Sequence, residues 1–430
     1  MKKNAIALAV GALCIAPAAQ AQIVFGNDQI GTMQIYGRLY PQMQASKTSG
    51  ASTAGTPVST MAVTSGTLAT SGVDQGTHFG IQTSNSRLGF RGERRLGSTG
   101  MKAIWQLEQA INFEDPDDVA AGGGGVSGTD VVFATRNSFV GLNTAFGTVK
   151  LGNMDTIYKE YGDTLNMFGI KSGNLVSASN MLSHIGIGSS GAARFHERTP
   201  NSIQYETPTF AGLTLGVQYM PDERHGDPAV TVNKKLWSYG AKWEQGPFYV
   251  SLAHEIHRDF FGGSANVASS LRNSGDAHAS SKDTATRLSA VWRFMQGHEF
   301  TFDIAKMKWT EQPGIAITAP RFAEFKHTNW ALGYEGRLGG GWRTAAQFVQ
   351  AGEGSCSFQG PPTLTCTTTG LKSNMISLAL GYDLDRQTRL YAIGNRTNNG
   401  ASARYDSTSL LSPARGADIT SYALGISYTF

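Results

Sequence analysis

The chain lacks a long apolar run. After residue 21 no stretch approaches the roughly 18 consecutive apolar residues that a membrane-spanning helix needs, and the mean hydropathy of the chain is −0.22. By themselves these features are typical of a water-soluble protein. They are also expected for a membrane β-barrel, because lipid-facing and lumen-facing residues alternate along each strand and their hydropathies average out.

A strong charge of one sign is missing as well. The chain has 36 basic and 32 acidic residues, and its net charge is +4. This balance excludes the basic surface of a nucleic-acid-binding protein, so we expect no nucleic-acid partner.

No catalytic motif stands out. The nearest candidate, His254-Glu255-Ile256-His257, differs from the H-E-x-x-H zinc motif. On a strand its two histidines would point to opposite faces and could not share a metal. We therefore expect no enzyme, no metal and no other cofactor, with a lipase- or protease-like barrel as the enzymatic alternative.

Cysteine is scarce. Cys14 lies in the N-terminal apolar segment. A lipoprotein signal is the alternative role of that segment, but the bulky Leu13 before Cys14 disfavours it. Cys356 and Cys366 flank a loop with two adjacent prolines. An exported chain meets oxidising conditions, in which such a pair forms a disulfide. We predict this bond, with free surface thiols as the alternative. No further Cys or His lies nearby in the sequence to complete a metal site.

The N-terminal segment has the pattern of an export signal. Lys2 and Lys3 precede an apolar run that ends near Ile15, and Ala19-Gln20-Ala21 has the small-x-small pattern of a cleavage site. We predict that residues 1–21 are a signal peptide and that the mature chain begins at Gln22.

Alternation of apolar and polar residues is abundant. In Thr420 to Phe430, one parity consists of aromatic and aliphatic residues and the other of small or polar ones. Alternate side chains of a strand point to opposite faces, so this segment is predicted to be a strand with one apolar face. A strand that ends the chain on Phe resembles the closing strand of a bacterial outer-membrane β-barrel.

The chain repeats one pattern: about ten alternating residues, a short turn, about ten more and a long polar loop. Short turns are predicted at 96–100, 145–147, 210–212, 245–247, 296–298, 339–341 and 383–387. Long loops are predicted at 46–77, 114–130, 154–198, 221–235, 258–283, 310–327, 352–372 and 398–418. These turns and loops separate sixteen strands. No Gly/Pro-rich linker interrupts residues 22–430, so we predict one barrel domain whose first strand (34–42) pairs with its last.

Alternation alone does not say which face meets lipid. In 286–294, Leu288 and Trp292 lie on one face and Arg287 and Arg293 on the other. A soluble sandwich or barrel with an apolar core is the alternative. An eight-stranded barrel fills its interior with side chains, whereas sixteen strands leave an aqueous channel. The charged face is therefore predicted to line water, and the sheet to close, because an open edge in lipid would leave backbone groups unpaired.

Several segments resemble general-diffusion porins of the Gram-negative outer membrane, in the style of the β-proteobacterial family. They are Ile35 to Tyr40 (IYGRLY), Ser86 to Phe113, Phe133 to Asn153, Asn201 to Tyr219 and the last strand. The resemblance implies an all-β, sixteen-stranded antiparallel transmembrane barrel in the outer membrane. It also implies a homotrimer in contact with outer-membrane lipid and lipopolysaccharide, and a third extracellular loop folded into the pore as a constriction.

The resemblance carries a set of constriction residues over to this chain. The basic wall corresponds to Arg38 in YGR, Arg87 in SRLGF and Arg136 in ATRNSF, and alternation independently places Arg38 and Arg87 on the polar face. A plain solvated strand face is the alternative for these arginines. The acidic side corresponds to loop residues Asp155, Glu160 and Asp163, and further candidate pore-lining cations are Lys150 and Arg198. The chain departs from the family pattern at Asn153, where arginine is frequent, and in the apolar loop segments 167–170 and 181–182.

The predicted chemistry is selection and not reaction. Guanidinium groups are permanently charged, and charged rings bias the ions that pass a pore. We predict a water-filled channel for passive diffusion of small hydrophilic solutes and ions, with a weak preference for anions. The alternative is a substrate-specific channel for sugars, phosphate or organic anions, because Tyr36 and Tyr40 share the face of Arg38.

Overall fold

A computed structural model describes most of the chain. The described residues are 23–27, 31–113, 135–165, 167–170, 175–188, 191–222, 233–273, 278–314, 317–407 and 410–430. The predicted signal peptide (1–21) and the predicted loop at 114–130 lie outside them.

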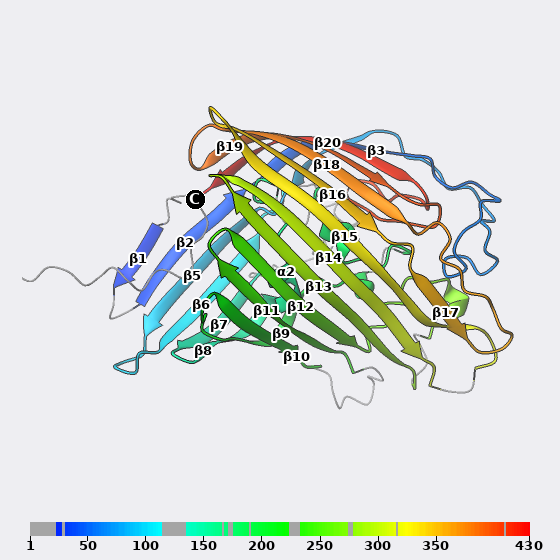
Figure 1. Ribbon diagram of the computed structural model, residues 1–430, viewed down its shortest axis with the longest axis horizontal. Coiled ribbons are helices and arrows are strands. Elements are labelled where there is room, and N and C mark those ends of the chain that lie inside the picture. The colour runs from blue at the N-terminus through cyan, green and yellow to red at the C-terminus, as the bar shows by residue number, and fades with distance from the viewer. Residues whose placement is uncertain are drawn as a thin grey trace, which may run out of the picture.

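Strands joined by turns and long loops make up the described chain (Figure 1). The strands are β1 (Ile23–Asn27), β2 (Gly31–Leu39), β3 (Pro41–Ser49), β4 (His78–Thr83), β5 (Arg87–Arg95), β6 (Lys102–Ala110), β7 (Ser138–Thr144), β8 (Gly147–Asp155), β9 (Arg198–Glu206), β10 (Leu213–Met220), β11 (Lys235–Gln245), β12 (Phe248–Arg258), β13 (Ser280–Phe294), β14 (His298–Gln312), β15 (Arg321–Gly339), β16 (Trp342–Ala351), β17 (Ser355–Gln359), β18 (Ser373–Asp383), β19 (Thr388–Asn398) and β20 (Asp418–Thr429). The helical elements are α2 (Ile157–Gly162), α3 (Ser179–Leu182), η1 (Gly191–Ala193) and η2 (Ser269–Leu271).

The strands form one antiparallel sheet that closes on itself. β20 pairs with β19 along one edge and with β3 and the end of β2 along the other. At the seam Gly37 and Phe430 exchange both backbone hydrogen bonds, at 2.9 and 3.0 Å. The Phe430 ring occupies the space that a Cβ on Gly37 would need. The prediction that the first strand pairs with the last is confirmed.

The described strand segments make up a sixteen-stranded barrel. β2 and β3 form one barrel strand that is interrupted at Tyr40, and β4 and β5 form the neighbouring one. The reason is that β2 pairs with β5 and β3 pairs with β4. β1 pairs only with β2, and β17 only with β15, so both are short additions to the wall. The predicted strand count is confirmed. The sequence pattern did not predict β1, β17 or the helices.

The apolar face of the sheet points outward. Trp237, Leu378 and Leu424 are 43%, 60% and 67% exposed. In contrast, Ser238, which follows Trp237, and Ala423, which precedes Leu424, are buried. An exposed apolar band around a closed sheet is the surface that a bilayer covers. No helix among the described residues is long and apolar enough to cross a membrane.

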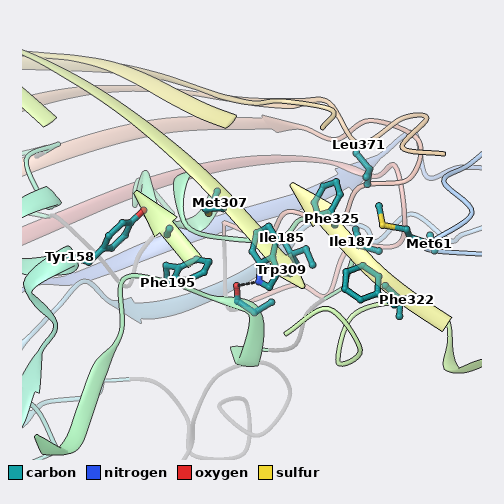
Figure 2. Packing of buried hydrophobic residues seen from close by; sticks show 14 of the residues in the cluster. Met61, Tyr158, Ile185, Ile187, Phe195, Met307, Trp309, Phe322, Phe325 and Leu371 are labelled. Carbon is teal, nitrogen blue, oxygen red and sulfur yellow. Dashed lines mark hydrogen bonds between the residues drawn. The ribbon is translucent and has the colours of Figure 1, made fainter. Parts of the chain in front are cut away.

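An apolar core lies where the long loops meet the inner face of the sheet. Met61 from loop 50–77 belongs to one apolar cluster with Ile185, Ile187 and Phe195 from the segment between β8 and β9 and with Trp309 of β14 (Figure 2). The Trp309 indole donates a hydrogen bond of 3.1 Å to the Ala193 carbonyl. This core fixes the loops against the wall.

Candidate functional site

The segment 156–197, between β8 and β9, begins with α2. The Thr156 hydroxyl caps the helix by accepting a hydrogen bond of 3.3 Å from the Lys159 amide, which satisfies one of the donors that a helix start leaves unpaired. The helix packs on β10 to β13. The Tyr158 amide donates to the Ser238 hydroxyl at 2.8 Å, and the Ser251 hydroxyl donates to the Tyr161 carbonyl at 2.8 Å. Ser238 alternates with the exposed Trp237, so α2 lies on the inner face of the barrel.

Gly216 of β10 makes the close approach of α2 possible. A Cβ at this position would meet the Tyr161 hydroxyl and the Ile157 side chain below 3 Å. The helix therefore needs a glycine in the facing strand.

The rest of the segment packs on other parts of the inner wall, from β15 to β20 and at the junction of β2 and β3. The Phe168 amide donates to the Glu335 carboxylate at 3.1 Å, and the Phe168 carbonyl accepts from the Tyr40 hydroxyl at 2.9 Å. Farther along, Asn329 donates to the Met181 carbonyl at 2.8 Å. The apolar loop residues pack on small inward-facing residues, among them Ala345, Ala379 and Ala423 for 167–170, and Ala331, Val349 and Ala351 for 181–182. The apolar content of this segment thus serves to attach it to the wall.

The three predicted wall arginines come together on the inner face. Arg38 and Arg87 are direct partners in the pairing of β2 with β5, and both line, with Arg136, a hollow of about 380 Å³. The arrangement follows from register, because residues opposite each other on paired strands point to the same face.

Glu108 of β6 holds two of these arginines. Its carboxylate lies 3.2 Å from Arg87 Nε and 2.7 Å from Arg136 Nε, and it accepts a hydrogen bond of 3.0 Å from the Tyr36 hydroxyl. Glu108 was not among the residues predicted from the sequence. Its parity with Lys102 and Gln106 is the signal that would place it on the polar face of its strand, but the strand register that brings it to Arg87 cannot be read from consecutive residues.

Arg38 has a different environment. Its Nη2 donates to the Tyr40 hydroxyl at 2.8 Å, and its guanidinium lies 4.4 Å from the centre of the Tyr40 ring. Gly169 of the 156–197 segment lies so close that a Cβ there would collide with Arg38 Nη2. No carboxylate of the described residues forms an ion pair with Arg38.

The placement of Asp155 in the third loop is wrong. β8 extends to Asp155, which pairs with Arg198 at the start of β9. Its carboxylate lies 2.8 Å from Arg198 Nη2 and 3.1 Å from Lys159 Nζ, and it accepts a hydrogen bond of 3.0 Å from Asn137. A register shift between Gly152 and Met154 lets the pairing continue beyond the predicted end of the strand. Asp155 therefore belongs to the wall.

The other two predicted carboxylates lie on or next to α2. Asp163 ends the helix, and its carboxylate is 3.4 Å from His196 Nε2. Glu160 is exposed on the helix. Desolvation by the surrounding wall, and next the negative charge of Glu206, raise the pKa of Glu160, while Lys150 and Lys242 act against this rise. Because the side chain is exposed, lumen water offsets part of the desolvation.

A second charged group lies beside α2. The Glu206 carboxylate is 3.2 Å from Lys150 Nζ and 3.2 Å from Lys242 Nζ, and it accepts a hydrogen bond of 2.9 Å from the Tyr161 hydroxyl. Lys150 was a candidate from the sequence, and Glu206 and Lys242 were not. The group joins the wall to the helix that carries Glu160.

The charge of the hollow beside Arg38 is positive. Its lining contains five basic side chains, Arg38, Arg87, Arg91, Arg136 and Lys159, and three acidic ones, Glu108, Asp155 and Asp163. Glu108 and Asp155 each contact two cations. Because the basic side chains outnumber the acidic ones, the wall carries a modest surplus of positive charge. Such a surface attracts small anions and repels small cations.

The histidines at 254 and 257 lie on opposite faces of β12. His257 is buried and lies 3.0 Å from the Glu255 carboxylate, whereas His254 contacts the outward-facing Tyr239 ring. No cluster of metal-binding side chains occurs among the described residues.

A closed antiparallel barrel with an apolar exterior and a charged interior wall defines a transmembrane β-barrel protein. The family follows from comparison with known proteins. A profile described as "Gram-negative porin" matches residues 5–402, and this chain belongs to that family. The membership confirms the resemblance noted from the sequence, the outer-membrane location and the prediction that the chain is not an enzyme.

Individual relatives are more distant. The major outer membrane protein P.IB of Neisseria lactamica is 31% identical over 182 residues, which cover 42% of this chain and 45% of the relative. P.IB of Neisseria gonorrhoeae is 31% identical over 175 residues, covering 40% of this chain and 41% of the relative. The chain thus matches less than half the length of these relatives.

Solved structures match over almost the whole chain. The anion-selective porin from Comamonas acidovorans has a TM-score of 0.62 at 20% identity, with 93% of this chain and 100% of that chain covered. OmpT of Vibrio cholerae has a TM-score of 0.57 at 11% identity, with 95% and 100% covered. At these identities the similarity establishes the fold.

Proposed function

We propose that this chain forms a water-filled channel for passive diffusion of small hydrophilic solutes and ions across the outer membrane, with a weak preference for anions. The observation that carries the proposal is the positive hollow on the inner wall, with five basic and three acidic side chains. The anion selectivity in the name of the Comamonas acidovorans porin agrees with this sign.

We further propose that residues 156–197 constrict the channel. Its α2 packs on β10 to β13, and its Phe168 bonds to Tyr40, at the junction of β2 and β3. These two attachments, on different parts of the inner wall, support a path of the segment across the lumen. In this proposal Glu160 and Asp163 oppose Arg38, Arg87 and Arg136.

The preference for anions should be weak. Arg87 and Arg136 share one carboxylate, that of Glu108, so their two positive charges are half neutralised. Lys150 and Lys242 likewise share one carboxylate, that of Glu206. Pairing of this kind leaves a field across the channel and little net charge in it.

The chain is also proposed to form a homotrimer. Large apolar side chains with unusually high exposure occupy adjacent strands at the seam, where Leu424 is opposite Met43, and Phe79 lies on the next strand. An apolar patch of this kind on one side of a barrel fits contact with a neighbouring subunit. The remaining outer face would contact outer-membrane lipid and lipopolysaccharide.

A general channel fits the wall better than a sugar-specific one. Aromatic rings that bind sugars must have an uncovered face, yet Arg91 lies 4.9 Å from the centre of the Tyr36 ring and Arg38 covers Tyr40. These rings stack on guanidinium groups. A specific channel for phosphate or organic anions stays the alternative.

The test is the reversal potential of the purified protein in planar bilayers under a salt gradient. We expect an anion preference that decreases in Arg38→Gln, Arg87→Gln and Arg136→Gln. Arg396→Gln is the matched control, because Arg396 is 52% exposed and paired with Asp418 outside the hollow. A cation preference of the unmodified protein would contradict the proposal, and conductance that saturates with phosphate would favour the specific channel.

A further inference from the structure

A second hollow lies among the long loops, apart from the charged wall. Its volume is about 320 Å³. Loop 50–77 forms one side of it and loop 399–417 the other. The lining residues are Ser52, Leu68, Thr70, Ser71, Gly72, Arg404, Ala414 and Arg415.

The two arginines of this hollow bond to backbone carbonyls. Arg404 Nε donates to the Pro413 carbonyl at 3.1 Å. Arg415 Nη1 donates to the carbonyls of Ile187 at 2.8 Å and Ser402 at 2.9 Å. Within the described part of the chain, no carboxylate forms an ion pair with either guanidinium. A guanidinium has five N–H donors, so both groups keep donors for a ligand.

The environment of the pair favours an anion. Burial, and next the positive charge of Arg404, lower the pKa of Arg415 to about 10. Two like charges beside one hollow repel each other, and an anion placed between them removes that repulsion. Planar guanidinium groups match the oxygens of phosphate and carboxylate, to which they form charge-assisted hydrogen bonds.

The frame of the hollow is held by backbone contacts. The Ser52 amide donates to the Arg415 carbonyl at 2.9 Å, and the Gly72 amide donates to the Ser52 carbonyl at 2.8 Å. The Arg404 amide donates to the Gly186 carbonyl at 2.8 Å, which joins the hollow to the 156–197 segment. Ser71 adds a hydroxyl, which accepts a hydrogen bond from the Ala54 amide at 2.9 Å and keeps its own proton for donation.

We propose that this hollow binds a phosphate-like oxyanion between Arg404 and Arg415, with the hydroxyls of Thr70 and Ser71 as additional donors. The oxyanion is either free inorganic phosphate or a phosphate group of lipopolysaccharide, since both present the same oxygens at the long-loop end of the barrel. The site is separate from the wall arginines, so its existence does not depend on the ion selectivity of the channel.

The first test uses the unmodified protein in detergent. An arginine-specific dicarbonyl reagent is applied with and without inorganic phosphate, and modified peptides are quantified by mass spectrometry. We expect phosphate to slow the modification of Arg404 and Arg415, whereas chloride at equal ionic strength does not. Arg396 is the internal control, because its guanidinium is paired with Asp418 at 2.9 Å. Equal effects of phosphate on all three arginines would overturn the proposal.

The second test measures binding by calorimetry in Arg404→Gln, Arg415→Gln and the control Arg396→Gln. Loss of one charge-assisted contact should weaken binding of inorganic phosphate or of lipopolysaccharide by about tenfold. If the variants bind inorganic phosphate more weakly and lipopolysaccharide as well as the parent does, the ligand is the free anion. If the variants bind lipopolysaccharide more weakly, and removal of its phosphate groups abolishes this difference from the parent, the ligand is the lipid. The side chain of Arg404 makes one backbone hydrogen bond within the described residues, to the Pro413 carbonyl, so Arg404→Gln serves if Arg415→Gln misfolds. Unchanged binding of both ligands in a folded Arg404→Gln protein would refute the site.

Discussion

Arg136 Nε lies 2.7 Å from Glu108 Oε1, and the other oxygen of the same carboxylate serves Arg87 at 3.2 Å. Glu108 is only 5% exposed. One buried carboxylate thus balances two guanidinium groups on the channel wall, and the unbalanced charge is the source of the proposed anion preference.

Replacement of Glu108 by Gln should strengthen the anion preference. The substitution keeps the shape of the side chain and removes its charge, which leaves Arg87 and Arg136 unbalanced. We expect a larger reversal potential of the anionic sign and a loss of stability of about 1–3 kcal/mol, because two charged donors lose their ionised acceptor. Glu93→Gln is the control, since Glu93 is exposed and paired with Lys102. An unchanged reversal potential in a folded Glu108→Gln channel would disprove the balancing role.

Gly169→Ala should disturb the position of Arg38. Gly169 has a φ of +87°, a conformation that costs a residue with a Cβ about 1 kcal/mol, and its new methyl group would collide with Arg38 Nη2. We expect altered single-channel conductance and a reduced anion preference. Gly55→Ala is a matched control, because Gly55 has a φ of +85° and nothing within 4 Å of an added Cβ. Equal effects of the two substitutions would show that backbone strain alone matters.

Loss of the disulfide should loosen the loops without closing the channel. Cys356 and Cys366 are joined by a disulfide with their Cα atoms 5.7 Å apart, as the sequence predicts, and the adjoining Thr367 accepts a hydrogen bond from the Ser59 hydroxyl of loop 50–77. The Cys356→Ser, Cys366→Ser double variant should lose about 3 kcal/mol, the value for a short closed loop.

Limited proteolysis of the disulfide variant should cut loop 352–372 faster than in the parent, with unchanged conductance in bilayers. The reduced parent protein is the control and should behave like the variant. If the loop is protected from the protease in both the variant and the reduced parent, the other loop contacts are sufficient to hold it in place without the disulfide.

Acid should weaken the attachment of the 156–197 segment. Burial, and next the charges of Arg194 and His327, lower the pKa of His184 from 6.5 to about 3. A detached segment would bind a proton near pH 6.5, whereas the attached one resists protonation until about pH 3. The contribution of His184 to attachment is therefore complete above pH 6.5 and is lost progressively as the pH falls toward 3.

The measurement for His184 is the frequency of current fluctuations in bilayers as the pH falls from 7 to 3. His184 Nδ1 accepts a hydrogen bond of 3.1 Å from the Gly186 amide, and the amide oxygen of Asn can take its place. His184→Asn should show a weaker dependence on pH than the parent. A parallel dependence in both proteins would assign the effect to other groups.

The position of most strands could be predicted from the sequence, and the position of the segment 156–197 could not. β19 shows the difference. Leu390 is outward and exposed, whereas Tyr391 and Ile393 are buried and belong to one apolar cluster with Phe168 and Ile170 of the distant segment. Alternation alone gave this strand no clear facing, because its inner face is apolar where the segment covers it.

The candidate site likewise has a part that the sequence predicts and a part that it does not. The position of Arg38 and Arg87 on the polar faces of their strands follows from alternation within short stretches of sequence. The meeting of Arg136 with Glu108, and the inclusion of Asp155 in β8, depend on how neighbouring strands are aligned.

The sequence by itself determined the barrel, its turns and the polarity of its two faces, because alternation with a period of two is written in consecutive residues. Only the tertiary structure decided which charges neutralise each other and where residues 156–197 attach. Those relationships join residues that are close only after the strands have paired in register and the sheet has closed.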